Sequence, residues 1–356
     1  MPRRQFRMAI RANLRRNPMN SDRLRALVAR FSTQRILVVG DLMLDEFIWG
    51  RVSRISPEAP VPVVEVSRTS YYPGGAANVA RNLREFTGHV DVMGLVGSCL
   101  HGGHLKTLLA DGGIGLDFLV EDAAWQTIVK TRIIARQQHV VRVDRENPAA
   151  PGQLRAAHAR ALAHLRDGGL ERFDAVILED YAKGFLGQEF VDEICELAAR
   201  AGKLLTVDPN PRNPLAWHHA TAVKPNRAEA FAAAGQPVVE PHELPTQDRA
   251  LLAVGATLLA RWQPRSLLIT LGEQGMMLFQ PERAPLHLPT RAKEVFDLSG
   301  AGDTAIALFT LALAAGGNAE EAAEISNHAA GVVVGKLGTA TLTPAELLES
   351  FERDEA

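Results

Sequence analysis

Residues 296–304 read Phe-Asp-Leu-Ser-Gly-Ala-Gly-Asp-Thr, and an apolar run without a charged residue follows to about residue 319. Small residues at 299–302 predict a tight turn leading into a buried helix. The first N–H groups of such a helix lack intrahelical partners, so they form an anion hole suited to a phosphoryl group. Asp303 lies beside this hole, where it could take a proton from an attacking hydroxyl. A plain N-cap aspartate would need neither two glycines nor so apolar a helix.

Alternating strands and helices surround this turn. Short apolar runs predict buried parallel strands at 35–40, 90–96, 175–178, 204–207, 221–224 and 266–271. Amphipathic stretches between them predict helices at 76–87, 102–111, 153–166, 188–201, 227–234 and 247–262. This order is typical of a doubly wound, mostly parallel α/β sheet with helices on both faces, in which ligands bind beyond the carboxyl ends of the strands.

Two segments, at about 47–67 and 131–144, break the alternation. Apolar and polar residues alternate in them, which predicts antiparallel strands with one solvated face. We interpret them together as a small β-flap, or lid, on the main sheet. Its apolar residues, such as Trp49 and Ile55, would be a liability if exposed, so we expect a homodimer in which two flaps pack together.

Composition and charge limit the partners and the cellular setting that we expect for the protein. The net charge is -2, which argues against a nucleic-acid partner, and the two cysteines favour a reduced, cytoplasmic setting. The apolar run after Asp303 is shorter than the ~20 residues of a membrane-spanning helix, so no membrane partner is expected. We expect one α/β domain over 33–345, preceded by a basic extension and first helix at 1–32 and followed by a terminal helix with an acidic tail at 346–356.

Polar residues and glycines follow the first strand and open the first helix after the flap. Asp41 and Asp45 come directly after the strand at 35–40 and could accept hydrogen bonds from sugar hydroxyls. Gly74 and Gly75 would let a ligand approach the backbone closely, and Asn78 adds an amide.

These residues resemble a known family. The segments 74–78 and 300–303 resemble the two signature regions of the ribokinase-like (PfkB) carbohydrate kinases, and the resemblance runs over about residues 33–345. Residues 224–229 resemble the family's Asn-x-x-Glu element, which organises magnesium and phosphates. Residues 270–275 resemble its nucleotide-side glycine turn, and Ser326-Asn327 its adenine-bordering helix. The implied nucleotide and magnesium residues are Asn226, Glu229, Thr270, Gly272, Gly275 and Asn327.

The resemblance implies ATP and Mg²⁺ as cofactors and direct in-line phosphoryl transfer. Asp303 would be the general base, and the backbone amides of the Gly300-Ala301-Gly302 turn would hold the γ-phosphoryl group. Asn226 and Glu229 would position magnesium through water. Asp297 and Ser299 could belong to a loop that binds a monovalent cation such as K⁺, as in some family members.

A narrower resemblance joins four segments, 38–45, 53–64, 136–144 and 180–184, to the heptose-7-phosphate kinases. It implies phosphorylation of D-glycero-β-D-manno-heptose 7-phosphate at its anomeric hydroxyl, giving the 1,7-bisphosphate for nucleotide-activated heptose and lipopolysaccharide synthesis. Some members carry a second, nucleotidyltransferase domain, and this chain resembles the stand-alone kinase. The substrate residues implied on the sugar side, beyond those named above, are Arg136, Asp180 and Lys183, with Arg132, Arg142, Arg51 and Arg54 as further candidates for the phosphate.

Alternatives remain open. Another sugar or nucleoside kinase of the same fold would share these motifs, and a non-catalytic sugar-phosphate sensor would be expected to have a damaged base or anion hole. His101-Gly-Gly-His104 matches a nucleotidyltransferase string, but it lies where the kinase pattern has a glycine segment. Glu179, Ser98-Cys-Leu100 and Ser299 depart from the usual residues; the first two bear on substrate preference.

Overall fold

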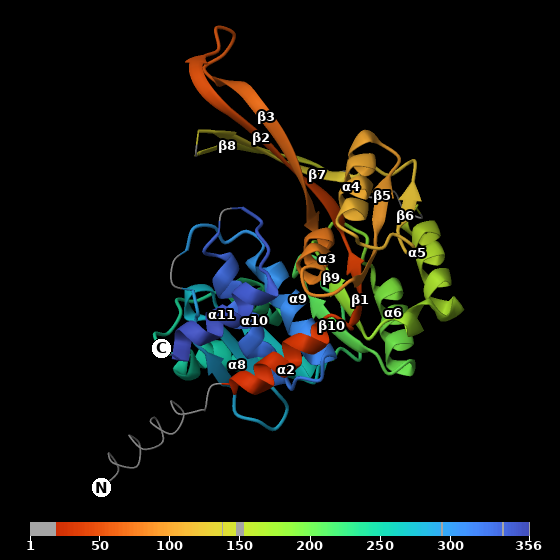
Figure 1. Cartoon of the computed structure of the whole chain (residues 1–356), viewed down its shortest axis with the longest axis vertical. Coiled ribbons are helices and arrows are strands. Elements are labelled where there is room, and N and C mark those ends of the chain that lie inside the picture. The colour runs from red at the N-terminus through yellow and green to blue at the C-terminus, as the bar shows by residue number, and fades with distance from the viewer. Residues whose placement is uncertain (1–18, 137, 147–152, 293–294, 337, 356) are drawn as a thin grey trace.

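The computed structural model describes residues 19–136, 138–146, 153–292, 295–336 and 338–355. The basic stretch 1–18 and Gln137, which belongs to one of the quoted segments, lie outside the described residues. Figure 1 shows an α/β body from which a long β-ribbon projects.

An eight-stranded sheet forms the centre of the body, in the order β14-β13-β12-β11-β10-β9-β1-β4. The strands are β1 (Arg35–Gly40), β4 (His89–Met93), β9 (Ala175–Glu179), β10 (Leu204–Asp208), β11 (Ala222–Val223), β12 (Ser266–Thr270), β13 (Met276–Phe279) and β14 (Leu286–Leu288). All pairs are parallel except those that β13 makes with β12 and β14. The predicted doubly wound, mostly parallel sheet is therefore confirmed.

Helices cover both faces of this sheet. They are α2 (Ser21–Phe31), α3 (Ala76–Arg84), α4 (Leu100–Asp111), α5 (Gln153–His164), α6 (Gln188–Arg200), α7 (Arg227–Ala234), α8 (Arg249–Trp262), α9 (Ala301–Ala314), α10 (Ala319–Val333) and α11 (Pro344–Glu355). Successive strand residues point to opposite faces. Ile36 and Val38 thus join the core with α2, α3, α9 and α10, whereas Leu37 and Val39 join the core with α6 and α8.

The predicted strand at 90–96 is divided in the structure. β4 ends at Met93, and β5 (Leu95–Gly97) leaves the main sheet to pair with β6 (Val120–Asp122). Gly94 lies at the break, where a Cβ would be only 2.5 Å from Leu42 Cγ. Packing of Leu42 against bare backbone therefore explains the break, which hydrophobicity alone does not reveal.

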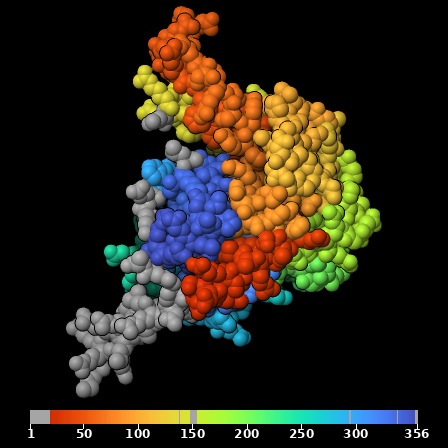
Figure 2. All heavy atoms as spheres, in the orientation of Figure 1, coloured from red at the N-terminus to blue at the C-terminus, as the bar shows by residue number. Residues whose placement is uncertain are grey.

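The flap is a four-stranded sheet in the order β3-β2-β7-β8. Its strands are β2 (Leu42–Ile55), β3 (Pro62–Gly75), β7 (Ile128–Ala135) and β8 (Gln138–Arg145), and the two hairpins that they form extend beyond the predicted segments at both ends. Each hairpin is antiparallel as expected, but β2 and β7 run parallel to each other. In Figure 2 the β2–β3 hairpin projects clear of the body, so β2 and β3 run from the body to the outer end of the flap.

The C-terminal residues form the expected terminal helix, and this helix packs on the body. Leu347 is fully buried, and the ring of Phe351 stacks on His328 of α10 with 3.6 Å between ring centroids. Burial of these apolar faces in the α2–α10 core requires α11 to be an integral helix.

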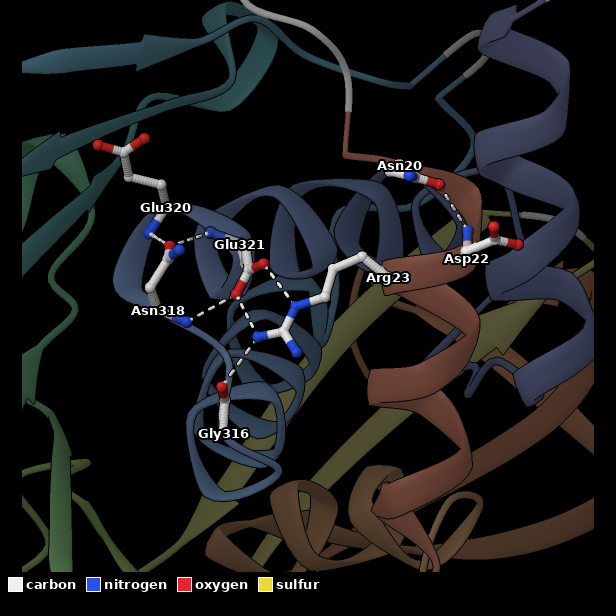
Figure 3. Close-up of polar contacts among 7 residues, drawn as sticks. All are labelled: Asn20, Asp22, Arg23, Gly316, Asn318, Glu320 and Glu321. Carbon is white, nitrogen blue, oxygen red and sulfur yellow. Dashed lines mark hydrogen bonds and ion pairs between the residues drawn. The ribbon is translucent and has the colours of Figure 1, made fainter.

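A polar contact ties α2 to the start of α10 (Figure 3). Arg23 donates two hydrogen bonds to the carboxylate of Glu321, at 2.8 and 3.0 Å, and one to the carbonyl of Gly316. Glu321 also closes a capping box with Asn318, so one carboxylate caps α10 and binds α2.

Within the ranges described, no helix is long and apolar enough to span a membrane.

We predict that Phe351→Ala lowers the free energy of unfolding by about 3–5 kcal/mol, because it leaves a cavity against His328. The exposed neighbour Glu352 serves as control, since Glu352→Ala should change stability by no more than about 0.5 kcal/mol. Urea denaturation followed by circular dichroism measures both. Equal, small effects would contradict an integral α11.

Candidate active site

The turn at 300–303 begins α9 as the sequence predicts. Gly300 has φ +83°, a left-handed conformation that an L side chain rarely adopts, and it precedes the first helical residue. Ala301, Gly302 and Asp303 form the first turn, whose N–H groups lack i−4 carbonyl partners. This turn lies at the carboxyl edge of the sheet, beside the ends of β9, β10 and β11.

Two donors from distant segments hold the Asp303 carboxylate. Asn78 Nδ2 donates to Oδ2 at 2.6 Å, and the Tyr181 hydroxyl donates to Oδ1 at 2.7 Å. Burial raises the pKa of Asp303 above its ordinary value, while these two hydrogen bonds and the Lys224 ammonium oppose the rise. The result is an oriented carboxylate, more basic than an exposed aspartate, which suits proton abstraction.

Asn78 belongs to a chain of hydrogen bonds that joins α3 to α9. Asn82 donates to the Asn78 carbonyl at 2.9 Å, and the Thr304 hydroxyl donates to Asn82 Oδ1 at 2.8 Å. Asn78 is buried, and its Oδ1 has no hydrogen-bond partner among the described residues. Asn78 therefore orients the Asp303 carboxylate; a direct contact with a sugar stays a prediction.

The paired glycines are required by close packing of the backbone. A Cβ on Gly74 would lie 2.7 Å from Asp45 Oδ2. Gly75 has φ +59°, and a Cβ there would lie 2.5 Å from the Asp41 carbonyl oxygen. These glycines let β3 pass against β2 and turn directly into α3, which brings Asn78 to Asp303.

Beneath the α9 turn lies a cluster of three charged side chains, of which Glu179 and Lys224 are buried and Asp208 is half-buried. They follow one another across the carboxyl ends of β9, β10 and β11, and Lys224 Nζ lies 2.7 Å from Asp208 Oδ2. Glu179 Oε2 is buried and has no hydrogen-bond partner among the described residues. A Cβ on Gly302 would lie 3.6 Å from Lys224 Nζ, so this ammonium lies close to the anion hole.

Burial dominates the electrostatics of that cluster. It raises the pKa of Asp208 to about 7 against the opposing effect of Lys224, and it raises the pKa of Glu179 well above its ordinary value. The neighbouring acids raise the pKa of Lys224, which stays charged. Its position directly after a strand is the one signal that could have identified Lys224 as a site residue.

Asp41 organises the loop 180–185. Its carboxylate accepts the backbone N–H groups of Tyr181, Lys183 and Phe185, each at 3.0 Å. Asp180 in turn accepts the N–H of Ala182 at 2.7 Å, and burial raises the pKa of Asp180 to about 7. These acids shape the loop; contacts of either with a sugar hydroxyl stay predictions.

The strand register divides the flap side chains between two faces. Tyr72, Asp45, Lys130 and Asp144 lie side by side across β3, β2, β7 and β8. Asp45 is close enough to Asp303 to raise its pKa, so this is the inner face, toward the base. The next row of the inner face is Ser70, Phe47, Arg132 and Arg142.

The cationic residues predicted to bind the phosphate divide into two groups, one on the inner face of the flap and one farther out. Arg132 pairs with Asp45 and lies 5.1 Å from the Phe47 ring centroid, and Lys183 Nζ lies 2.5 Å from Glu146. Lys130, which the sequence patterns do not indicate, lies near Lys183, and burial together with that ammonium lowers the pKa of Lys130.

Arg136, by contrast, is exposed at the β7–β8 turn with φ +58°. It has no described contact with Asp303. Arg51 pairs with Glu65 at 2.8 Å, farther out along the flap, and Arg54 lies beyond it on β2.

The nucleotide-side residues lie along the ends of β11 and β12. Asn226 and Glu229 form a reciprocal capping box at the start of α7, with hydrogen bonds of 2.8 and 2.9 Å. Thr270 forms a parallel bridge with Asn226. Gly272 and Gly275, with φ +60° and +86°, form the turn that follows.

Asn327 and Asp297 are held by backbone groups. Asn327 of α10 donates to the Pro289 carbonyl at 2.6 Å. The N–H groups of Ser299 and Gly338 hydrogen-bond to the Asp297 carboxylate and hold its pKa below the ordinary value, despite partial burial. Nothing in the described residues tests a potassium loop at Asp297 and Ser299, which stays a prediction.

The His101-Gly-Gly-His104 segment lies on α4, outside this site. The His104 ring lies 4.9 Å from the ring of Tyr71, and His101 Nε2 lies 3.3 Å from Arg145. Tyr71 and Arg145 belong to the face of the flap opposite Asp45, so the two histidines are separated from Asp303 by the flap sheet.

The chain matches the pfkB family of carbohydrate kinases over residues 33–346. A bifunctional protein HldE of Magnetococcus marinus is 43% identical over 328 residues, which are 91% of this chain and 65% of that protein. The protein of the same name from Escherichia coli is 40% identical over 324 residues, again 91% of this chain and 65% of that protein. The chain thus spans a little under two thirds of the length of these relatives.

Solved structures share the fold. The ribokinase of Thermotoga maritima superposes with a TM-score of 0.66 at 20% identity and covers 90% of this chain and 99% of its own. Phosphofructokinase-2 of Escherichia coli, in complex with potassium, superposes with a TM-score of 0.69 at 18% identity and covers 91% and 99%. With the family match over most of its length, this chain belongs to the pfkB family of carbohydrate kinases, phosphotransferases that act on an alcohol group.

Proposed function

We propose that the protein uses ATP to phosphorylate the anomeric hydroxyl of D-glycero-β-D-manno-heptose 7-phosphate, giving the 1,7-bisphosphate for nucleotide-activated heptose synthesis. The names of the relatives at about 40% identity support the heptose assignment. The observation that carries a phosphorylated sugar, in place of a neutral one, is the concentration of cations on the inner face of the flap.

Lys130 is the main residue among the cations that favour a phosphorylated sugar. It is half-buried beside a second ammonium, Lys183, and makes no ion pair with any residue in the described ranges. Arg132 and Arg142 occupy the adjacent row of the same face. Asp45 and Asp144 flank Lys130 in the strand register and favour its charged form, but burial and the Lys183 ammonium outweigh them and lower its pKa. A phosphate dianion near Lys130 and Lys183 would supply the further negative charge that favours both ammonium groups.

The reaction follows from the geometry around Asp303. Its carboxylate takes the proton of the sugar hydroxyl as the oxygen attacks the γ-phosphorus; the new O–P bond forms in line with the breaking bond to ADP. The N–H groups of the α9 first turn and the ammonium of Lys224 stabilise the charge on the transferring group. An anomeric hydroxyl is more acidic than an ordinary alcohol, so a carboxylate is an adequate base.

Asn226 and Glu229 fit magnesium only through water. Each uses an oxygen of its side chain in the capping box, and no cluster of three His, Cys, Asp or Glu in the described ranges is grouped to hold a metal directly. The remaining Glu229 oxygen can bind the hydration shell that Mg²⁺ retains. Bound there, the ion would neutralise charge on the nucleotide phosphates.

The flap supports a homodimer. Five of its apolar side chains are between 43% and 60% exposed: Ile55, Val61, Val66, Val141 and Val143. A projecting ribbon with so many exposed valine and isoleucine side chains is a risk for aggregation unless it is covered. A second flap would cover it and close both active sites.

The proposed substrate is tested by incubating the protein with ATP, Mg²⁺ and a panel of acceptors. We expect phosphorylation of heptose 7-phosphate, with a product whose mass and NMR spectrum show a phosphate on the anomeric carbon. Turnover of ribose, fructose or adenosine without turnover of heptose 7-phosphate would identify another kinase of the family.

Asp303→Asn should lower kcat by about 10²- to 10⁴-fold with little change in the melting temperature, because the amide cannot accept the hydroxyl proton. Asp111→Asn, at an exposed position of α4, is the control. Steady-state kinetics and thermal denaturation measure both, and full activity of the Asp303 variant would refute its role as base.

Val141→Asp combined with Val143→Asp should convert a dimer into a monomer, because two charges would be buried at the interface. Val238→Asp places the same charge at an exposed site outside the flap and should leave the assembly unchanged. Sedimentation velocity distinguishes the two; a monomeric parent protein would disprove the homodimer.

A further inference from the structure

We propose that Tyr181 is a positioning residue for Asp303, and that its loop, residues 180–185, couples binding of the sugar's phosphate at Lys183 to the orientation of the base. The inference rests on the proposed function insofar as the acceptor is a phosphorylated sugar. It concerns two residues on one loop, one facing the base and the other facing the phosphate cations.

Tyr181 completes the support of the base. Its hydroxyl donates to one oxygen of Asp303 and Asn78 donates to the other, so the plane of the carboxylate is determined. Each carboxylate oxygen keeps a lone pair for the attacking hydroxyl. Without Tyr181, one oxygen would lose its donor and the carboxylate could rotate away from the position of attack.

The loop behaves as one unit because both of its ends are held. Asp41 accepts three of its N–H groups, including those of Tyr181 and Lys183. At the far end, His158 Nε2 of α5 lies 2.6 Å from the Phe185 carbonyl oxygen. Ala182, between the two functional residues, has φ +53°, a conformation that persists only where neighbours impose it.

Lys183 connects this loop to the phosphate. In the structure its ammonium pairs with Glu146 and lies beside Lys130. A phosphate dianion is a stronger partner than a carboxylate, so its arrival would redirect Lys183. A single strained residue separates Lys183 from Tyr181, and Asp41 holds both N–H groups, so a backbone shift at Lys183 would carry Tyr181 with it. Binding energy from the remote phosphate is thereby used at the reacting centre.

The first experiment measures the pH dependence of kcat for Tyr181→Phe. The hydroxyl stabilises ionised Asp303, so its loss raises the pKa of the base. The base acts when ionised; the acidic limb of the profile should therefore move to higher pH, with kcat about ten- to a hundredfold lower. The other charged groups facing Asp303, namely Lys224, Asp45, Glu179 and Asp208, are unchanged in this variant.

Tyr71→Phe is the matched control, because it removes a hydroxyl that hydrogen-bonds Glu46 on the outer face of the flap. It should leave kcat and the acidic limb as in the parent protein. A Tyr181→Phe profile identical to the parent would overturn the proposal. So would a lower kcat with an unmoved limb, which indicates a structural role alone.

The second experiment supplies the sugar and a substitute for its phosphate as two separate molecules. The parent protein is assayed with ATP and the heptose lacking its 7-phosphate, with and without inorganic phosphite. Phosphite should raise kcat several-fold in the parent protein and have no effect on kcat in Tyr181→Phe. No stimulation of the parent, or equal stimulation of both proteins, would overturn the coupling.

These outcomes are separable from failure of the proposed function. If the substrate panel shows an unphosphorylated sugar or nucleoside as acceptor, the heptose assignment and the coupling to a phosphate both fail, while the pH profile of Tyr181→Phe with that acceptor still tests the positioning role. If heptose 7-phosphate is the acceptor and Tyr181→Phe behaves as the parent, the inference alone fails.

Discussion

The site depends on the two hydrogen bonds that hold the half-buried Asp303 carboxylate, one donated by Asn78 and one by Tyr181. Asp303, Asn78 and Tyr181 come from α9, α3 and the loop after β9, and they meet within hydrogen-bond distance. Burial makes the carboxylate more basic, while the two donors keep it ionised and oriented. The paired glycines, the Asp41-bound loop and the left-handed Gly300 each bring one of these three groups into place.

The second constraint is charge at the carboxyl edge of the sheet. Glu179, Asp208 and Asp303 gather there with Lys224 as the adjacent cation, an arrangement that burial makes costly and that an arriving polyphosphate would change. The flap adds a separate set of cations around Lys130. Under the proposed function, one end of the site would serve phosphoryl transfer and the other would bind an anionic part of the acceptor.

Much of the fold follows from local patterns. The strands at 35–40, 175–179 and 266–270 are apolar runs of ordinary strand length, and α7 begins at a capping box that is legible in the sequence. Patterns that depend on a neighbour are not legible in this way. Gly94 ends β4 because Leu42 packs on it, and α11 is a core helix because Phe351 meets His328.

The sequence by itself determined the chemistry of the phosphoryl-transfer turn, because Gly300-Ala-Gly-Asp303 and the apolar helix behind it are contiguous and carry their own geometry. Only the tertiary structure decided which residues surround that turn. Lys224 and Tyr181 stand in quoted segments without a predicted role, and Lys130 stands in none. Arg136, a predicted substrate residue, lies at an exposed hairpin turn. The reason is physical: strand register and crossover connections, which join residues more than a hundred positions apart, set these contacts.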